Sequence, residues 1–388
     1  MIQNSYNHRT KASLIQTTIL EEIVGSHAAQ VAVDELGLAM ATHTGSKRER
    51  NEDRLAVARI TAPNTEMYTI ALVCDGVGGS EYGDQAASIA IASIISDLAQ
   101  QQGRSSLKEL TVALVRRADD LVRKELQGRG ATTLVMLLAS TNGHLVCANV
   151  GDSRAYSWDT SSSKLDQITV DDTIENELKN IPGDHNALIN ARRLQGRLSQ
   201  AIGESGRVSD DLRVQIYAKE RFCNSAVLGS DGLWHAAKDF ETIVGNSATP
   251  MDAVRRAIAL ANWVGGVDNA SMIAIGDMER LCGPRQTESS IGRQQTGITL
   301  WTALSKIKLL TNDWIDETKR AEVCAKPEKQ KKSVKKSVKK KPLRAEGQTQ
   351  LKLESPDSKD ARPKVEVTIS EDAESRGVGQ VDVKEGRE

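Results

Sequence analysis

Aromatic side chains are scarce in this sequence: phenylalanine, tyrosine and tryptophan together make up 3% of its 388 residues. The large rings that often dominate a core are therefore few, and we expect a core of alanine, valine, isoleucine and leucine. The sequence also lacks a run of about 18 apolar residues, which predicts that no segment crosses a membrane as a helix. Residues 1–22 lack the basic-then-apolar pattern of a secretion signal.

Cysteine is scarce as well, and no two cysteines form a C-x-x-C motif. The five lie far apart, at Cys74, Cys147, Cys223, Cys282 and Cys324. An odd number at these spacings argues against a disulfide framework or a zinc knuckle and indicates reduced thiols, so we expect a cytoplasmic protein. Basic and acidic residues balance at 51 and 52, and the total charge therefore implies no nucleic-acid partner.

The most informative feature that is present is Asp75-Gly76. The pair follows the apolar run 67–74, which predicts a buried strand, and it opens a glycine-rich turn. A carboxylate at the end of a buried strand, next to a glycine whose backbone no side chain covers, is well placed to hold a hard cation. Three further aspartates sit in the same way next to apolar runs, in Gly151-Asp152, Ser230-Asp231-Gly232 and Asp268-Asn269. The chain is therefore expected to gather aspartates at one edge of a β core.

Six acidic residues at turn positions form a candidate metal site: Glu52, Asp53, Asp75, Asp152, Asp231 and Asp268. None has a histidine or cysteine at ligand spacing, and an all-oxygen site favours Mg²⁺ or Mn²⁺ over zinc. Several carboxylates at one point repel each other unless cations neutralise them. Two ions about 3.5–4 Å apart lower the pKa of a shared water and hold a phosphoryl group for in-line attack.

Arg48 lies four and five residues before Glu52 and Asp53. A guanidinium beside such ions can grip two phosphate oxygens at once. Together with the carboxylates, this arginine predicts a metal-dependent phosphate hydrolase.

The pattern of apolar residues predicts an α+β protein. Period-two runs and tight-turn signals at Asn142-Gly143 and Gly151-Asp152 indicate hairpins, and hence antiparallel pairing. Helical periodicity appears at 84–101, 106–126 and 251–264. Strands are expected within 36–60 and at 67–74, 131–139, 144–150, 153–158, 212–217, 222–229 and 270–277.

The domain organisation follows from changes in composition along the chain. We expect a loosely attached, partly ordered leader at 1–35, a catalytic domain at 36–284 with a polar flap at about 166–210, a linker at 285–297, an amphipathic helix at 298–320 and a disordered tail at 321–388.

The tail begins with nine lysines in residues 326–341 and becomes acidic after residue 354. Three interpretations stay open. The lysines form a solvated tail, tether the protein to nucleic acid, anionic lipid or an acidic protein, or associate with the acidic segment.

Seven segments, in order, resemble the motif series of the PP2C-type (PPM) protein Ser/Thr phosphatases, in a form similar to bacterial members. They are Arg48–Asp53, Val73–Gly79, Ala131–Leu134, Asn149–Arg154, Leu198–Gly203, Gly229–Trp234 and Asp268-Asn269. The resemblance implies two packed antiparallel β-sheets flanked by helices on both faces. It also implies hydrolysis of phosphoserine and phosphothreonine in protein substrates by a metal-bridging hydroxide.

The resemblance also assigns roles to individual residues. Asp75 would bridge two Mn²⁺ or Mg²⁺ ions, with Glu52 and the Gly76 carbonyl on the first. Asp231 and Asp268 would hold the second ion, and Asp53 would act through water. Asp152 would join Asp231 around a weaker third ion, and Arg48 would bind the substrate phosphate.

One position departs from many members of this family. A histidine that follows the Asp-Gly pair there is a proposed general acid, and Val77 stands in its place. A metal-bound water is then the default acid, with His43 as another candidate. The same departure leaves open an inactive pseudo-phosphatase that binds phosphoproteins without turning them over.

Overall fold

The computed structural model describes residues 11–103, 105–181, 194, 196–235, 237–283 and 297–310. All of them belong to a single unit of the chain. The expected linker up to residue 296, residues 311–320 and the tail at 321–388 lie outside the described residues. No helix within these ranges has both the length and the apolar character needed to cross a bilayer.

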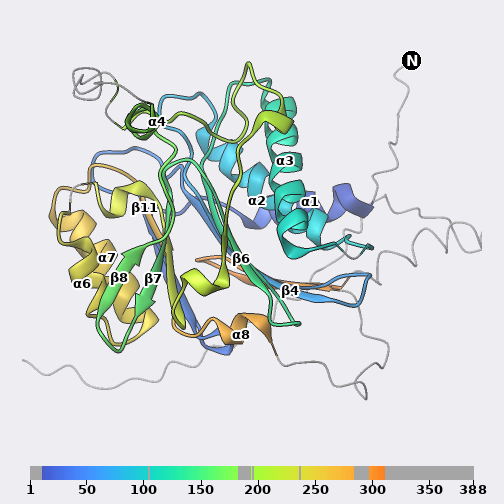
Figure 1. Ribbon diagram of the computed structural model, residues 1–388. Coiled ribbons are helices and arrows are strands. Elements are labelled where there is room, and N and C mark those ends of the chain that lie inside the picture. Colours follow the sequence, from blue (N-terminus) through green and yellow to red (C-terminus); the bar gives the residue numbers. More distant parts are fainter. Residues whose placement is uncertain are drawn as a thin grey trace, which may run out of the picture. The chain divides into compact units, whose positions relative to one another are not determined.

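Two antiparallel β-sheets lie at the centre of the described structure (Figure 1). The first has six strands in the order β1 (Ala28–Val33), β2 (Leu38–His43), β11 (Ala270–Ile275), β10 (Ser225–Gly229), β7 (Arg154–Asp159) and β8 (Lys164–Gln167). The second has seven, in the order β13 (Lys306–Leu310), β12 (Gly297–Trp301), β3 (Arg54–Thr61), β4 (Met67–Cys74), β5 (Leu134–Ser140), β6 (Leu145–Val150) and β9 (Gln215–Ala218).

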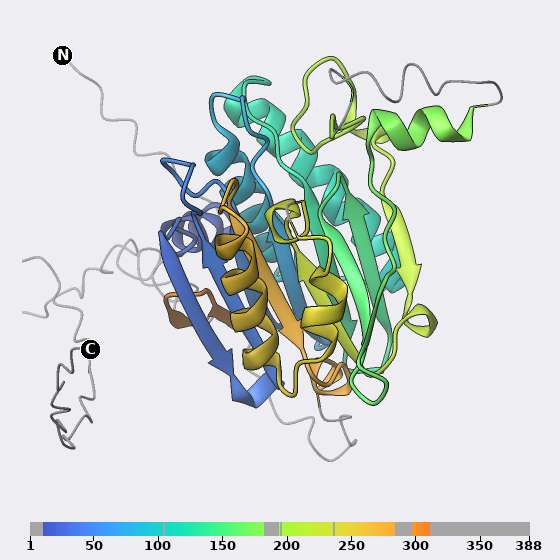
Figure 2. The same cartoon turned by 90° about the vertical axis from the view of Figure 1, so that its left-hand side faces the viewer.

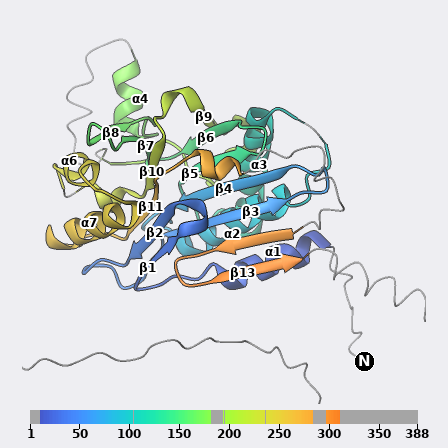
Figure 3. The same ribbon diagram turned by 90° about the horizontal axis from the view of Figure 1, so that it is seen from below.

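Helices cover the outer face of each sheet, and Figure 3 shows the two helical layers on opposite sides of the sheets. The seven-stranded sheet carries α1 (Lys11–Glu22), α2 (Gly83–Leu98) and α3 (Leu107–Leu126). The six-stranded sheet carries α6 (Phe240–Gly245) and α7 (Pro250–Trp263), drawn in yellow and brown in front of it in Figure 2. The described residues also form the short helices α4 (Ile174–Asn180) and α8 (Glu279–Cys282). The predicted α+β sandwich, flanked by helices on both faces, is confirmed.

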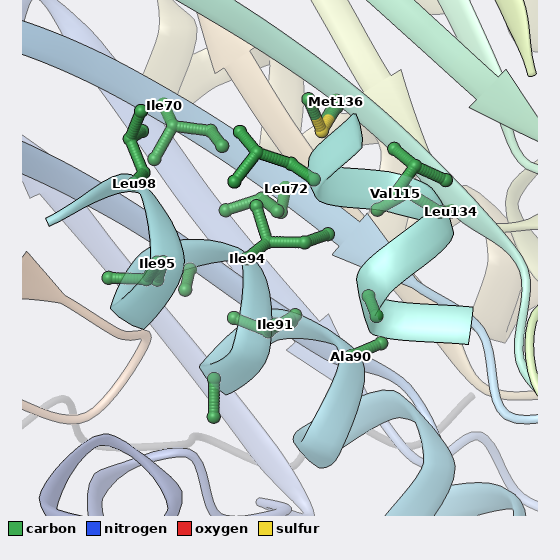
Figure 4. Packing of buried hydrophobic residues seen from close by; sticks show 14 of the residues in the cluster. Ile70, Leu72, Ala90, Ile91, Ile94, Ile95, Leu98, Val115, Leu134 and Met136 are labelled. Carbon is green, nitrogen blue, oxygen red and sulfur yellow. The ribbon is translucent and has the colours of Figure 1, made fainter. Parts of the chain in front are cut away.

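Strand β4 shows why the central runs are apolar throughout. Its side chains alternate between the two faces, so that Ile70 and Leu72 pack against the helices while Ala71 and Val73 face the other sheet. Because both faces are buried, no polar alternation is left to see in the sequence. Figure 4 shows Ile70 and Leu72 beside Ile94 of α2 and Val115 of α3.

Helix α3 begins where its sequence predicts. The Ser106 hydroxyl accepts a hydrogen bond from the Glu109 backbone N–H at 3.2 Å, and the Glu109 carboxylate accepts one from the Ser106 backbone N–H, which forms a capping box. Leu110, Leu114 and Ala118 recur at four-residue spacing and are buried against α2 and the sheet.

The prediction of an amphipathic helix at 298–320 is wrong over its described part. Residues 297–310 form the hairpin β12–β13, and β12 pairs with β3. Ile298 and Leu300 are buried, while Lys306 and Lys308 are exposed, which is the alternation of a strand. The free edge of β3 supplied a pairing partner that local periodicity cannot reveal.

The expected loose attachment of residues 1–35 is also wrong for its described part. Ile15 and Ile19 of α1 are 0% exposed and belong to the core beside α2, and β1 pairs with β2 along its whole length. This segment therefore adds a helix beside α2 and an edge strand to the six-stranded sheet.

We predict that Ile19→Ala lowers the free energy of unfolding by about 3 kcal/mol, because it leaves a cavity in this core. Leu14→Ala, at a 37% exposed position of the same helix, should cost less than about 1 kcal/mol. Urea unfolding followed by circular dichroism measures both. Equal small effects would show that α1 is loosely attached after all.

Candidate metal centre

A cleft of about 470 Å³ lies where loops from both sheets meet. Five of the eight predicted site residues line it, and they are Arg48, Asp75, Asp152, Asp231 and Asp268. Each of the four aspartates adjoins a strand: Asp75 follows β4, Asp152 lies between β6 and β7, Asp231 follows β10 and Asp268 precedes β11. The strand-end pattern therefore does bring these carboxylates to one edge of the sandwich.

The backbone of Asp75 is held by the segment before β5. Its N–H donates to the Thr133 hydroxyl at 3.0 Å, and its carbonyl accepts from the Thr133 N–H and the Thr132 hydroxyl, both at 2.8 Å. Residues 131–133 were expected to continue a strand, but β5 begins at Leu134. They depart from the strand because their donors and acceptors serve the Asp75 loop.

Two glycines allow backbones to approach each other closely at this edge. A Cβ on Gly76 would lie 2.5 Å from the Gly83 carbonyl carbon and 2.9 Å from the Glu52 carbonyl oxygen. A Cβ on Gly232 would lie 2.0 Å from the Asn269 carbonyl oxygen. Any side chain at either position would force the acidic loops apart.

Arg48 is bound to two of the predicted metal ligands. Its Nη2 lies 2.7 Å from Asp268 Oδ2, and its Nη1 lies 3.8 Å from Glu52 Oε2. The loop that carries Arg48 is fixed by Asn269, whose side chain accepts from the Glu52 N–H at 2.8 Å and donates to the Thr44 and Arg50 carbonyls. Glu52 lies next to Arg48 but is not among the residues that line the cleft. Burial raises the pKa of its carboxyl group.

Asp53 lies behind the cleft and is 2% exposed. Its Oδ2 accepts a hydrogen bond from the Ser230 hydroxyl at 2.7 Å, while its buried Oδ1 has no hydrogen-bond partner. Burial, followed by the charges of Asp231 and Asp268, raises the pKa of Asp53 to about 7. A buried carboxylate with an unsatisfied oxygen is costly, which fits a group that serves a cation or a bound water.

Two of the carboxylates that line the cleft, Asp75 and Asp152, also have a pKa raised by burial and by neighbouring acids. Burial and the nearby charges of Asp53 and Asp231 hold the pKa of Asp75 well above its usual value. Burial, and then the charges of Asp231 and Asp171, raise the pKa of Asp152 to about 7. These groups resist ionising together in the protein alone, as expected of a cluster that is neutralised by cations.

Asp231 is the exception, and its partner was missed in the sequence. Burial alone would raise its pKa, but the hydrogen bond and charge of His235 outweigh that effect and lower it. His235 Nδ1 lies 2.9 Å from Asp231 Oδ2. Their four-residue spacing was the available signal, since residues i and i+4 of a helical turn face each other.

His43 is placed differently from the expectation that it serves as a general acid. Its Nδ1 accepts a hydrogen bond from the Gly45 N–H at 2.8 Å, and its ring centroid lies 5.3 Å from that of His27. It is not among the residues that line the cleft, whereas Val77 is.

The donor set fits a hard divalent cation in its chemistry: buried carboxylates, one orphaned oxygen and no thiolate. Within the described ranges, however, no three histidine, cysteine, aspartate or glutamate side chains are arranged so that they could hold a metal ion. The Arg48–Asp268 and His235–Asp231 contacts occupy oxygens that a cation would require. If Asp231 and Asp268 held a cation, their side chains would have to turn from these partners.

One wall of the cleft comes from the region predicted as a flap, of which residues 182–193 and 195 lie outside the described residues. Gln200 and Ala201 line the cleft. Ile202 exchanges two backbone hydrogen bonds with Thr132, at 3.0 and 2.8 Å. Asp119 of α3, which is fully buried, accepts from the Gly203 N–H at 2.7 Å. This wall is therefore tied both to the Asp75 loop and to the helical layer.

Comparison with known proteins agrees with the site and the fold. The model of the protein phosphatase 2C family matches residues 41–263, which is more than half of the chain. The serine/threonine phosphatase stp of Listeria monocytogenes is 28% identical over 248 residues, covering 60% of this chain and 93% of the relative. The corresponding protein of Listeria welshimeri is 27% identical over 250 residues, with the same coverage.

Solved structures show the same fold. A bacterial serine phosphatase matches with a TM-score of 0.51 at 23% identity, over 62% of this chain and 98% of that one. Serine/threonine phosphatase Stp1 from Staphylococcus aureus matches with a TM-score of 0.50 at 23% identity, over 65% and 98%. The seven ordered motifs, the two-sheet sandwich and the family match agree, and the chain belongs to the protein phosphatase 2C family.

Proposed function

We propose that this protein serine/threonine phosphatase hydrolyses phosphoserine and phosphothreonine in protein substrates by direct in-line attack, without a covalent phosphoenzyme. The observation that carries the proposal is the meeting of Arg48 with Asp75, Asp152, Asp231 and Asp268 in one cleft. These residues come from segments up to 220 positions apart in the chain. A purely structural role does not account for four buried or partly buried acids in one place.

The carboxylates would hold Mn²⁺ or Mg²⁺. Asp75 would bridge two ions, with Glu52 and the Gly76 carbonyl on the first and Asp231 and Asp268 on the second. Asp53 would contribute through water, and Asp152 with Asp231 would hold a weaker third ion. When bound, the ion pair would supply a bridging hydroxide as the nucleophile and would neutralise the acid cluster.

Arg48 would bind the phosphate through its planar, permanently charged guanidinium. Gly78 makes room for this, because a Cβ there would lie 3.0 Å from Arg48 Nη1. Engaging a phosphate would exchange the present bond to Asp268 for bonds to phosphate oxygens, and would release that carboxylate to the cation. Val77 supplies no proton, so water is the proposed acid for the leaving oxygen.

We predict that Asp75→Asn and Asp231→Asn each lower kcat for an aryl phosphate by about 1000-fold, because each removes a charge that holds the ions. Circular dichroism should show the fold unchanged. Asp166→Asn, at an exposed carboxylate of β8, is the matched control and should retain full activity. Undiminished turnover in excess EDTA would contradict the proposal.

A second prediction concerns Arg48. Arg48→Ala should lower kcat/KM for a phosphopeptide by about 100-fold through loss of charge-assisted bonds to the transferred phosphoryl group. Arg48→Lys should recover part of the loss, since it restores the positive charge but not the paired hydrogen bonds of a guanidinium. Arg50→Ala is the control in the same loop, because Arg50 is exposed and does not line the cleft. An equal loss in both alanine variants would refute a specific role for Arg48.

Metal binding should also be visible without turnover. Mn²⁺ at 100 times its dissociation constant should stabilise the folded protein by about 2.7 kcal/mol, because the ion binds the native acid cluster and not the unfolded chain. Thermal unfolding with and without Mn²⁺ measures this, with Asp166→Asn as a control that keeps the shift. A wild-type protein whose unfolding ignores Mn²⁺ would exclude the proposed centre.

A further inference from the structure

Asp172 is a buried carboxylate just beyond β8 that sequence reasoning did not single out. It is 2% exposed, and both of its oxygens are fully engaged. Oδ2 accepts from the Gly151 N–H at 3.0 Å and from the Gln200 side-chain amide at 2.8 Å. Oδ1 accepts from Arg213 Nη2 and from the Gln215 side-chain amide, both at 2.7 Å.

The backbone of Asp172 makes further connections between the same segments. Its N–H donates to the Gly151 carbonyl at 2.9 Å, so Asp172 holds both polar groups of that residue. Its carbonyl accepts from the Ser199 N–H at 2.8 Å. One residue thus joins the Gly151-Asp152 turn, the cleft wall at 199–200 and the start of β9.

The turn that Asp172 holds has little freedom of its own. Gly151 has φ +98°, and a Cβ there would lie 2.8 Å from Thr133 Cγ2. Thr133 in turn binds the backbone of Asp75. The Asp152 carboxylate is consequently placed relative to Asp75 by the contact of Gly151 with Thr133 on one side and by its bonds to Asp172 on the other.

We propose that Asp172 is a positioning residue for Asp152, and that it couples this cation ligand to Gln200 on the cleft wall. The inference rests on the proposed role of Asp152 in holding a cation. Four hydrogen-bond donors converge on the two oxygens of this carboxylate. An asparagine here would place its NH₂ group against two of these donors, whichever way its amide is turned. A carboxylate that served only as the ion-pair partner of Arg213 would not need Oδ2 aimed at the Gly151 N–H.

Amide hydrogen exchange on the metal-free protein in EDTA tests the contact directly. In Asp172→Asn the Gly151 N–H should exchange at least about 10-fold faster, since its acceptor is lost, while amides of β4 should be unchanged. In parallel, calorimetric titration with Mn²⁺ should show the weakest ion bound about 10-fold less tightly, the usual effect of removing a group that orients a ligand. Unchanged exchange at Gly151, or an unchanged titration, overturns the inference.

Gln200 and Gln215 bind opposite oxygens of Asp172, and replacing each by the uncharged methionine provides a matched comparison. Gln200→Met removes a hydrogen bond from Oδ2, which also holds Gly151, and should weaken the same Mn²⁺ site. Gln215→Met removes one from Oδ1 and should leave Mn²⁺ binding unchanged. Equal effects of the two variants would mean that the carboxylate is only structural. This pair decides the question if Asp172→Asn does not fold.

The Asp152→Asn background distinguishes a failure of this inference from a failure of the proposed metal centre. If Asp172 acts through Asp152, then Asp172→Asn should not weaken Mn²⁺ binding further in that background. A full additional loss there overturns the inference while the metal centre stands. A wild-type protein that binds no Mn²⁺ refutes the proposed function instead, and the exchange rate of Gly151 still reports whether Asp172 holds the turn.

Discussion

Repulsion among buried carboxylates is the constraint on which the rest of this structure depends. Burial and neighbouring charge raise the pKa values of Asp53 and Asp152 to about 7 and hold that of Asp75 well above its usual value. A cluster of this kind destabilises any fold that assembles it without cations. It persists because each acid adjoins a strand whose apolar side chains are buried on both faces, so that the sheets fix the backbone irrespective of the charges.

The loops between strands and acids are held by buried polar groups rather than by packing. Asn269 holds the Arg48 loop, Thr133 the Asp75 loop and Asp172 the Asp152 turn. Each of these contacts joins residues far apart in sequence, with all donors and acceptors satisfied. Such networks specify one geometry, because a slip of any loop would leave a buried group without a partner.

The sequence predicted the elements whose patterns are complete within a short window. Strand β4 was placed at its observed bounds by its apolar run, and α3 within one residue by its helical periodicity. The acidic loops were predictable because each aspartate follows or precedes such a run. The β12–β13 hairpin was not, since Trp301, Leu304 and Ile307 recur at the three-residue spacing of a helix face. The pairing of Ile298 and Leu300 with β3 decides the strand instead. Asp172 was missed because its partners are brought to it only by the fold. His235 was missed although its four-residue spacing from Asp231 was visible in the sequence.

The hydrogen bonds also show that the cleft wall at residues 200–203 and the acid cluster are not independent parts. Ile202 is paired in both directions with Thr132, whose hydroxyl binds the Asp75 carbonyl. Gln200 shares the Asp172 oxygen with Gly151, and Gly203 is bound to Asp119 of the helical layer. Residues 200–203 thus cannot shift without disturbing the backbone of a proposed cation ligand. Contact of a phosphoprotein with this wall would therefore act on the geometry of the acids as well as on affinity, because the same bonds maintain both.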